Sequence, residues 1–118
     1  MRPRGGPVRH DAGVNDYVQV MTTTDRRDHA DMLAGELVEA RHAACVQVVG
    51  PMRSHYRWQG RVEQAEEWLL VVKTTAERLD AVMSAIATRH HYDVPEITAT
   101  PIVGGSPAYL DWIRASVA

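Results

Sequence analysis

The spacing of apolar residues predicts a strand and then a helix at the start of the folded chain. Residues 17–23 alternate between apolar and polar side chains and are rich in β-forming types, as is typical of a strand. Asp25 and Asp28 follow with the spacing of a capping box. Apolar residues then recur at helical spacing up to about His42, which predicts a first helix. These residues are Ala30, Leu33, Ala34, Leu37 and Val38.

The next segments predict a long β-hairpin. Residues 44–49 form its first strand, which a Gly-Pro pair interrupts before a second alternation at residues 52–59. The dipeptide at residues 59–60 suits a hairpin turn. The returning strand ends in a continuous apolar run at residues 68–72, typical of a strand covered on both faces. Such a hairpin overhangs a domain of this size and needs a surface to pack against. One face of its outer part carries Met52, Ser54, Tyr56 and Trp58.

The last third of the chain predicts a helix, a strand and a short final helix. Thr74 and Glu77 fit a Thr-x-x-Glu capping box, and a second helix follows them. Residues 96–103 are interpreted as the fourth strand, in which Pro101 indicates a sheet edge or a bulge. The Ser-Pro pair at residues 106–107 fits the N-cap and the first position of the last helix. The apolar stripe of the second helix consists of Leu79, Val82, Met83 and Ile86.

The order of these elements is β-α-β-β-α-β plus a C-terminal helix. With its central hairpin, this order predicts an α+β fold of the ferredoxin-like, split-βαβ type. Residues 17–118 are expected to form a single domain, which agrees with a chain of 118 residues. Residues 1–16 are rich in Gly, Pro, Arg and Asp without any periodicity, and we expect them to be a flexible tail.

Composition and charge narrow the functional classes and the compartment. The net charge is -2 with both signs scattered, which gives no reason to expect nucleic acid or an anionic membrane as a partner. The one cysteine, Cys45, cannot form an intrachain disulfide, and in an apolar strand it is expected to be a small buried hydrophobe. No apolar run follows the N-terminus, and none approaches the about 20 residues of a membrane span. We therefore expect a cytoplasmic protein.

Five short motifs stand in order along residues 17–116. They are Ala44-Cys45-Val46, Tyr56-x-Trp58-x-Gly60, Lys73-Thr74, the octapeptide His-His-Tyr-Asp-Val-Pro-Glu-Ile at residues 90–97, and Tyr109-Leu110-x-Trp112. In order and spacing they resemble the signature of the CutA divalent-cation-tolerance family. The resemblance implies a homotrimer in which the long hairpins of neighbouring subunits pair edge to edge. It also implies a shape related to the PII signalling proteins and a link to tolerance of copper and other divalent cations.

The chain departs from the family pattern at two points. The family commonly has His-Pro-Tyr-Glu where this chain has His-His-Tyr-Asp at residues 90–93. Some members also have a cysteine at the end of the first strand, where this chain has Met21. The second departure speaks against a thiolate-based copper site.

A candidate metal site lies between the second helix and the fourth strand. His90, Asp93 and Glu96 fall within seven residues, and imidazole and carboxylate groups are ligands for Cu(II), Zn or Ni. We expect them near one another at a cleft walled partly by a neighbouring subunit, with Met21 approaching from beneath as a thioether ligand for Cu(I). In the alternative interpretation, His90 and Glu96 are structural hydrogen-bonding groups and Met21 fills the core. Adjacent histidines tend to point apart, so His91 is not expected to chelate an ion together with His90.

The remaining aromatic and histidine residues have structural interpretations. The aromatic side chains of the hairpin are expected to anchor the trimer interface rather than to form a platform for ligand stacking. These side chains are Tyr56, Trp58 and Trp68. Three further histidines are expected at the solvent-exposed surface: His29, His42 and His55.

Three functions remain open at the level of the sequence. The first is a trimeric divalent-cation-tolerance protein that binds copper or another divalent metal at inter-subunit clefts. The second is a PII-like signalling protein that senses a small molecule in the same clefts. The third is a hydrolase of acylphosphatase type, which needs an arginine in an anion cradle where this chain has three threonines at residues 22–24. No catalytic motif stands out, so we expect a protein that is not an enzyme.

Overall fold

The computed structural model describes residues 16–118, so all but the last residue of the predicted tail lies outside the described residues. These residues form four strands, three α-helices and one turn of 3-10 helix. In order these are β1 (Tyr17–Thr24), α1 (Arg27–Glu39), β2 (Cys45–Trp58), β3 (Arg61–Thr75), η1 (Ala76–Arg78), α2 (Leu79–Arg89), β4 (Thr98–Pro101) and α3 (Pro107–Ser116).

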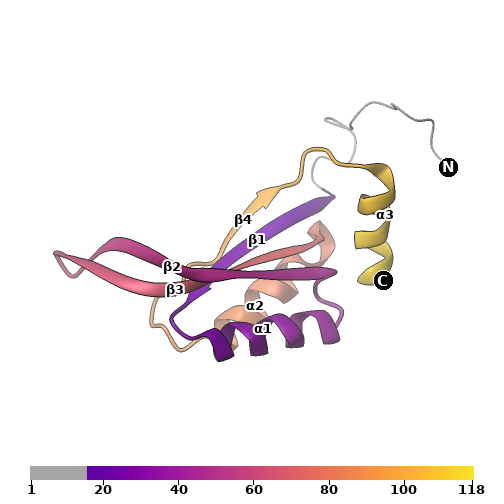
Figure 1. Cartoon of the computed structure of the whole chain (residues 1–118). Coiled ribbons are helices and arrows are strands. Elements are labelled where there is room, and N and C mark those ends of the chain that lie inside the picture. Colours follow the sequence, from indigo (N-terminus) through magenta and orange to yellow (C-terminus); the bar gives the residue numbers. More distant parts are fainter. Residues whose placement is uncertain (1–15) are drawn as a thin grey trace.

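The strands form one antiparallel sheet in the order β2-β3-β1-β4. Figure 1 shows α1 and α2 side by side on one face of this sheet, with α3 at the end far from the tip of the hairpin. This arrangement confirms the predicted ferredoxin-like fold. Within residues 16–118, no helix has the length and apolar character needed to cross a membrane.

The hydrophobic core lies between the sheet and the two long helices. Val20 of β1 pairs with Val72 of β3, and both side chains are fully buried. Leu70, two residues along β3, is buried on the same face. From the helices, Leu33 and Ile86 pack against this row. The apolar faces that follow from the 3.6-residue period of the helices and the two-residue period of the strands therefore pack together in one core layer, as the sequence pattern predicts.

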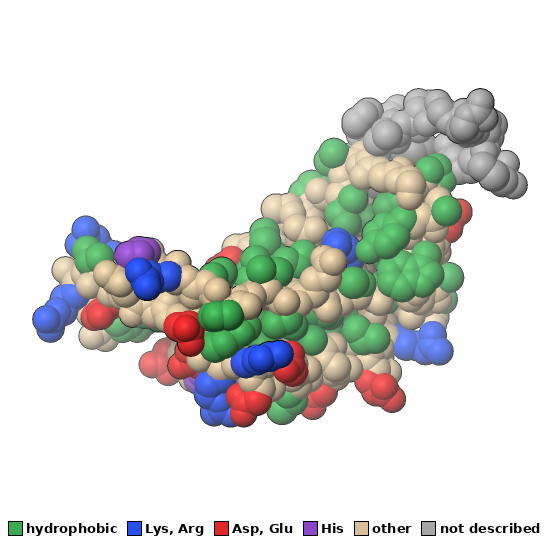
Figure 2. All heavy atoms as spheres, viewed as in Figure 1, with side chains coloured by type: hydrophobic (Ala, Val, Ile, Leu, Met, Phe, Trp, Pro, Cys, Tyr) green, Lys and Arg blue, Asp and Glu red, His purple; other side chains and the backbone are tan. Residues whose placement is uncertain are grey.

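The opposite face of the sheet is covered only in part. Leu69 and Val71 of β3 are half-buried, and Val49 of β2 is 52% exposed. The prediction that the run at residues 68–72 is covered on both faces is therefore wrong for the single chain. Helix α3 covers one end of this face, where Ile113 packs with Tyr17. Figure 2 shows hydrophobic side chains gathered on the surface between the base of the hairpin and α3.

The β2–β3 hairpin projects beyond the body of the molecule (Figure 1) and contributes to a longest dimension of 52 Å. Gln59 and Gly60 form its turn with φ angles of 50° and 77°, which confirms the predicted two-residue turn. Tyr56 and Trp58 lie on the same face of the strand, as the alternation predicts, and both side chains are more than 40% exposed.

The Gly-Pro pair at residues 50–51 does not end the strand. β2 continues through it with a shift of register between Val49 and Met52, so the predicted interruption is a β-bulge within one strand. Gly50 is required by a close approach, because a Cβ atom there would lie 2.6 Å from Cδ1 of Trp68. The bulge therefore depends on glycine next to this indole ring.

Both predicted capping boxes are wrong. α1 has Arg26 at its N-cap, and the Asp28 carboxylate accepts hydrogen bonds from the Arg26 side chain and from the backbone N–H of His29. Thr74 is a buried residue of β3 whose hydroxyl donates to the carbonyl oxygen of His42 at 2.6 Å. The threonine thus joins β3 to the α1–β2 connection instead of capping a helix.

Other element boundaries also differ from the predictions. α1 ends at Glu39, three residues before the predicted end, and β4 has four residues, far fewer than residues 96–103. Pro101 lies opposite Val18 in an edge strand, as predicted. Ser106 is the N-cap of α3, although its side chain makes no capping hydrogen bond.

Candidate functional site

The connection that follows α2 is held by His90. Its Nε2 lies 2.7 Å from the carbonyl oxygen of Thr23, and its Nδ1 accepts the backbone N–H of Tyr92 at 3.1 Å. A carbonyl oxygen can only accept, so Nε2 carries the proton and the imidazole is neutral. Burial lowers the pKa of His90, although the bond to Thr23 opposes this shift. His90 therefore fixes the turn through both of its ring nitrogens.

His29 lies behind this turn and is only 7% exposed, so the prediction that it faces solvent is wrong. Its Nδ1 lies 2.8 Å from the Thr24 hydroxyl, and its Nε2 lies 3.1 Å from the carbonyl oxygen of Arg89. A sequence signal for this burial exists, because His29 precedes the core residue Leu33 by one helical step of four.

His91 binds a different partner from its neighbour. Its Nε2 lies 2.8 Å from Oδ1 of Asp25, and this contact becomes an ion pair when the imidazole is protonated. The rings of His90 and His91 are stacked with centroids 5.4 Å apart rather than pointing apart. Their Nε2 atoms contact separate groups, Thr23 and Asp25.

A groove of about 790 Å³ opens between the hairpin and residues 91–96. Asp93 and Glu96 line it, so the structure brings these two predicted site residues to one cavity. His90 and Met21 are not among the lining residues. Met21 is half-buried within the sheet, where it pairs with Thr98. The aromatic residues of the lining are His55, Tyr56, Trp58, His91 and Tyr92.

The groove also contains a buried carboxylate that sequence reasoning missed. Glu67 is only 8% exposed, and the Tyr92 hydroxyl donates to its Oε2 at 2.8 Å. Burial raises the pKa of Tyr92, and the Glu67 carboxylate raises it further, so the phenol remains a donor. The available signal was the alternation of β3, which places Glu67 on the same face as Leu69 and opposite Met52.

The described residues do not assemble a complete metal centre within one chain. Among residues 16–118, no group of three or more His, Cys, Asp or Glu side chains is placed to hold a metal ion. Both nitrogens of His90 already have partners, and the Glu96 carboxylate accepts a hydrogen bond from the Thr98 hydroxyl at 3.5 Å. Cys45 is half-buried rather than buried, and it belongs to no such group.

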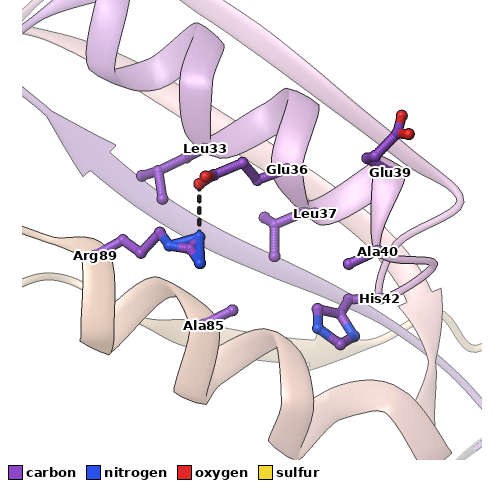
Figure 3. A pocket seen from close by; sticks show the side chains of 8 residues that line it. All are labelled: Leu33, Glu36, Leu37, Glu39, Ala40, His42, Ala85 and Arg89. Atoms are coloured by element: carbon purple, nitrogen blue, oxygen red, sulfur yellow. Dashed lines mark hydrogen bonds and ion pairs between the residues drawn. The ribbon is translucent and has the colours of Figure 1, made fainter.

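A second, smaller cavity of about 260 Å³ lies between α1 and α2 (Figure 3). Leu33, Leu37 and Ala85 form its apolar part, and Figure 3 shows the Glu36–Arg89 ion pair joining the two helices with a contact of 2.7 Å. His42 lines the cavity and is half-buried, so the prediction that it faces solvent is wrong in part. His55, by contrast, is exposed as predicted.

Comparisons with known proteins identify the family. The model of the CutA1 divalent ion tolerance protein family matches residues 18–116. The divalent-cation tolerance protein CutA of Thermus thermophilus is 44% identical over 95 residues, which cover 80% of this chain and 92% of the relative. The chloroplastic CutA protein of Arabidopsis thaliana is 38% identical over 99 residues, or 84% of this chain. The chain spans only about half the length of this relative (54%).

Solved structures give the same result. CutA from Xylella fastidiosa superposes with a TM-score of 0.85 at 33% identity and covers 87% of this chain and 99% of its own. The Thermus thermophilus protein superposes with a TM-score of 0.83 at 41% identity, covering 86% and 99%. Synechococcus elongatus CutA, solved in complex with a Bis-Tris molecule, gives a TM-score of 0.80 at 36% identity, covering 86% and 94%. The described chain, with its ferredoxin-like sheet and projecting hairpin, belongs to the CutA family of divalent-cation-tolerance proteins.

Proposed function

We propose that this protein acts in divalent-cation tolerance as a homotrimer whose inter-subunit clefts bind copper or another divalent ion. The observation that carries the proposal is the charge of the groove. Its lining contains the carboxylates of Glu67, Asp93 and Glu96, and none of its described lining residues is Lys or Arg. Such a cavity attracts cations. The names of the relatives, which refer to tolerance of divalent cations, support the same role.

The proposed trimer would cover surfaces that the single chain leaves exposed. β2 is an edge strand of the sheet, and its outer half carries Tyr56 and Trp58 at 44% and 43% exposure. An exposed edge with aromatic side chains is a template for pairing with another chain. Sedimentation equilibrium should give three times the chain mass of 13.1 kDa, and a monomer at micromolar concentration would contradict this part of the proposal.

The metal site would need donors from two copies of the chain. Asp93 and Glu96 offer carboxylates that are exposed at the groove, whereas Met21 is half-buried in the sheet. His90 could ligate only by giving up one of its hydrogen bonds, to Thr23 or to Tyr92. We therefore propose that the two carboxylates of one copy and a group of its neighbour supply the first contacts, with His90 joining only if the turn opens.

Calorimetric titration with Cu(II) tests this site. Asp93→Asn and Glu96→Gln should each weaken binding by at least tenfold, or about 1.4 kcal/mol. Glu66→Gln is the matched control, because Glu66 is exposed on the opposite face of β3 from Glu67. His90→Ala tests whether His90 is a direct ligand of the ion or only a structural residue. Unchanged copper binding in all three site variants would remove the metal role from this groove.

The groove also favours a second candidate function, the sensing of a small molecule. Its volume of about 790 Å³ lies within the range of about 300–1,000 Å³ typical of small-molecule sites, and its walls include the aromatic rings of Tyr56, Trp58 and Tyr92. A ligand of this kind would raise the melting temperature increasingly as its concentration exceeds its Kd, and a thermal-shift screen of metabolites checks this. The cytoplasmic location stays a prediction.

A further inference from the structure

Residues 91–96, which we call the strap, connect α2 to β4 without regular secondary structure. Within the described part of the chain, no backbone N–H or C=O group of the strap forms a hydrogen bond with another backbone group. Both ends of the strap are nevertheless fixed. At its start, the backbone N–H of His90 donates to the carbonyl oxygen of Ile86, and at its end Ile97 packs against the core. Val94, in the middle of the strap, is exposed.

Two side-chain contacts hold the strap against the body of the molecule. The Tyr92 hydroxyl donates to Oε2 of Glu67 at 2.8 Å, and Nε2 of His91 lies 2.8 Å from Oδ1 of Asp25. The ring of Tyr92 also packs against that of His90, with the two centroids 4.6 Å apart. A segment with few contacts and no backbone hydrogen bonds opens at a lower free energy than the helices and strands around it. The strap can therefore open while the core stays folded.

The two side-chain contacts differ in their access to water. His91 and Asp25 are both exposed, so their contact contributes little to holding the strap. Glu67 is buried, and a hydrogen bond from a hydroxyl to a carboxylate is stronger where water is excluded. Burial and the hydrogen bond to the Glu67 carboxylate both raise the pKa of Tyr92, so the phenol keeps the proton that it donates. The bond between Tyr92 and Glu67 is therefore the main fastening of the strap.

We propose that the strap is a hinged wall of the groove, and that the hydrogen bond between Tyr92 and Glu67 is the latch that keeps it closed. The hairpin supplies the opposite wall. Opening moves Asp93 and Glu96 away from the hairpin, widens the groove and brings the Glu67 carboxylate into contact with water. The hinges lie at the two fixed ends of the strap. This inference concerns a moving wall of the groove rather than what the groove binds, so it goes beyond the proposed function.

Relaxation-dispersion NMR of the ¹⁵N-labelled, full-length assembled protein tests the hinge. This method detects exchange on the microsecond-to-millisecond scale, on which lids open, and the backbone amides of the strap are the probes. Tyr92→Phe removes only the hydroxyl of the latch, so it should raise the population of the minor, open state at least fivefold. The buffer contains a chelator, so the outcome does not depend on the proposed metal role.

Three further variants locate the latch. Tyr109→Phe is the matched control, because it removes the same hydroxyl from α3, outside the groove, and it should leave the exchange unchanged. Glu67→Gln keeps an acceptor for Tyr92 but removes its charge, so its effect should lie between those of the wild type and Tyr92→Phe. Asp25→Ala removes the partner of His91 and should raise the open population less than Tyr92→Phe does.

Four results would overturn the proposal. Absence of exchange in the strap of both the wild type and Tyr92→Phe would mean that the strap does not open. Equal open populations in these two proteins would mean that another contact, such as one from a neighbouring copy, holds it closed. An equal rise in Tyr109→Phe would indicate a general loosening of the fold. A larger rise in Asp25→Ala than in Tyr92→Phe would place the latch at the exposed contact instead.

Discussion

The two faces of the sheet differ in how completely the chain covers them. On the face toward α1 and α2, Val20, Leu70 and Val72 are fully buried. On the other face, Leu69 and Val71 are half-buried, and Tyr56 and Trp58 of the hairpin are exposed. The same strand, β3, contributes alternate residues to both faces. One face therefore carries the core of the single chain, and the other stays partly exposed, where the proposed ligand and partner chains would bind.

The largest effect should come from the covered face. Leu70→Ala removes a fully buried side chain and should destabilise the fold by about 2–5 kcal/mol. Its matched control is Leu69→Ala, one residue earlier in the same strand but on the half-buried face. Chemical denaturation at protein concentrations low enough to favour single chains measures both. Equal losses would contradict the difference between the two faces.

Trp58→Ala tests the open face and should affect assembly more than folding. The side chain is 43% exposed in the single chain, so its truncation leaves the core intact. If it anchors the proposed trimer, the free energy of dissociation should fall by about 2 kcal/mol or more for each Trp58 contact. Sedimentation velocity over a dilution series provides the measurement. A trimer that dissociates at the same concentration as the wild type would show that Trp58 lies outside the interface.

A smaller effect is expected from the pH dependence of His90. Its pKa is lowered in the folded chain, so between the folded value and the unfolded value of about 6.5 the unfolded state binds more protons. The contribution of His90 to the free energy of unfolding is therefore complete above about pH 6.5 and decreases as the pH falls below this value. In chelator-containing buffer, the melting temperature of His90→Gln should change less between pH 7.5 and 5 than the melting temperature of the wild type. The exposed His55→Gln variant should follow the wild-type curve.

The smallest effect should come from the ion pair between the helices. Glu36 and Arg89 contact each other at 2.7 Å, but both side chains are 45% exposed. Such a pair contributes about 0.2–1 kcal/mol and weakens with added salt. A double-mutant cycle with Glu36→Gln and Arg89→Met measures it. A coupling as large as the loss in Leu70→Ala would mean that polar contacts, rather than apolar burial, hold the helix layer.

Local patterns in the sequence were sufficient to predict the order of the elements and the face of Tyr56 and Trp58. They failed where a side chain has a distant partner. Thr74 fitted a capping box, but its hydroxyl binds the carbonyl oxygen of His42, 32 residues earlier. Such a competition between local and long-range partners cannot be seen in a window of four residues.

The same limit applies to the candidate site. Asp93 and Glu96 were expected near each other, and both line the groove. The partner of His90 lies 67 residues earlier in the sequence, at Thr23, so the direction of its ring could not be predicted from the motif. Glu67 was missed because the hydrogen-bond partner of its carboxylate, Tyr92, lies 25 residues later.

Gly50 has a consequence for the engineering of this hairpin. A Cβ atom at this position would meet the indole of Trp68 at 2.6 Å and the carbonyl oxygen of Glu67 at 3.0 Å. The hairpin therefore divides into a fixed joint and an exchangeable turn. Foreign sequences grafted at residues 59–60 leave both the joint and the aromatic residues of the outer hairpin untouched, whereas any side chain at position 50 would press on the strand segment that carries the carboxylate of the groove.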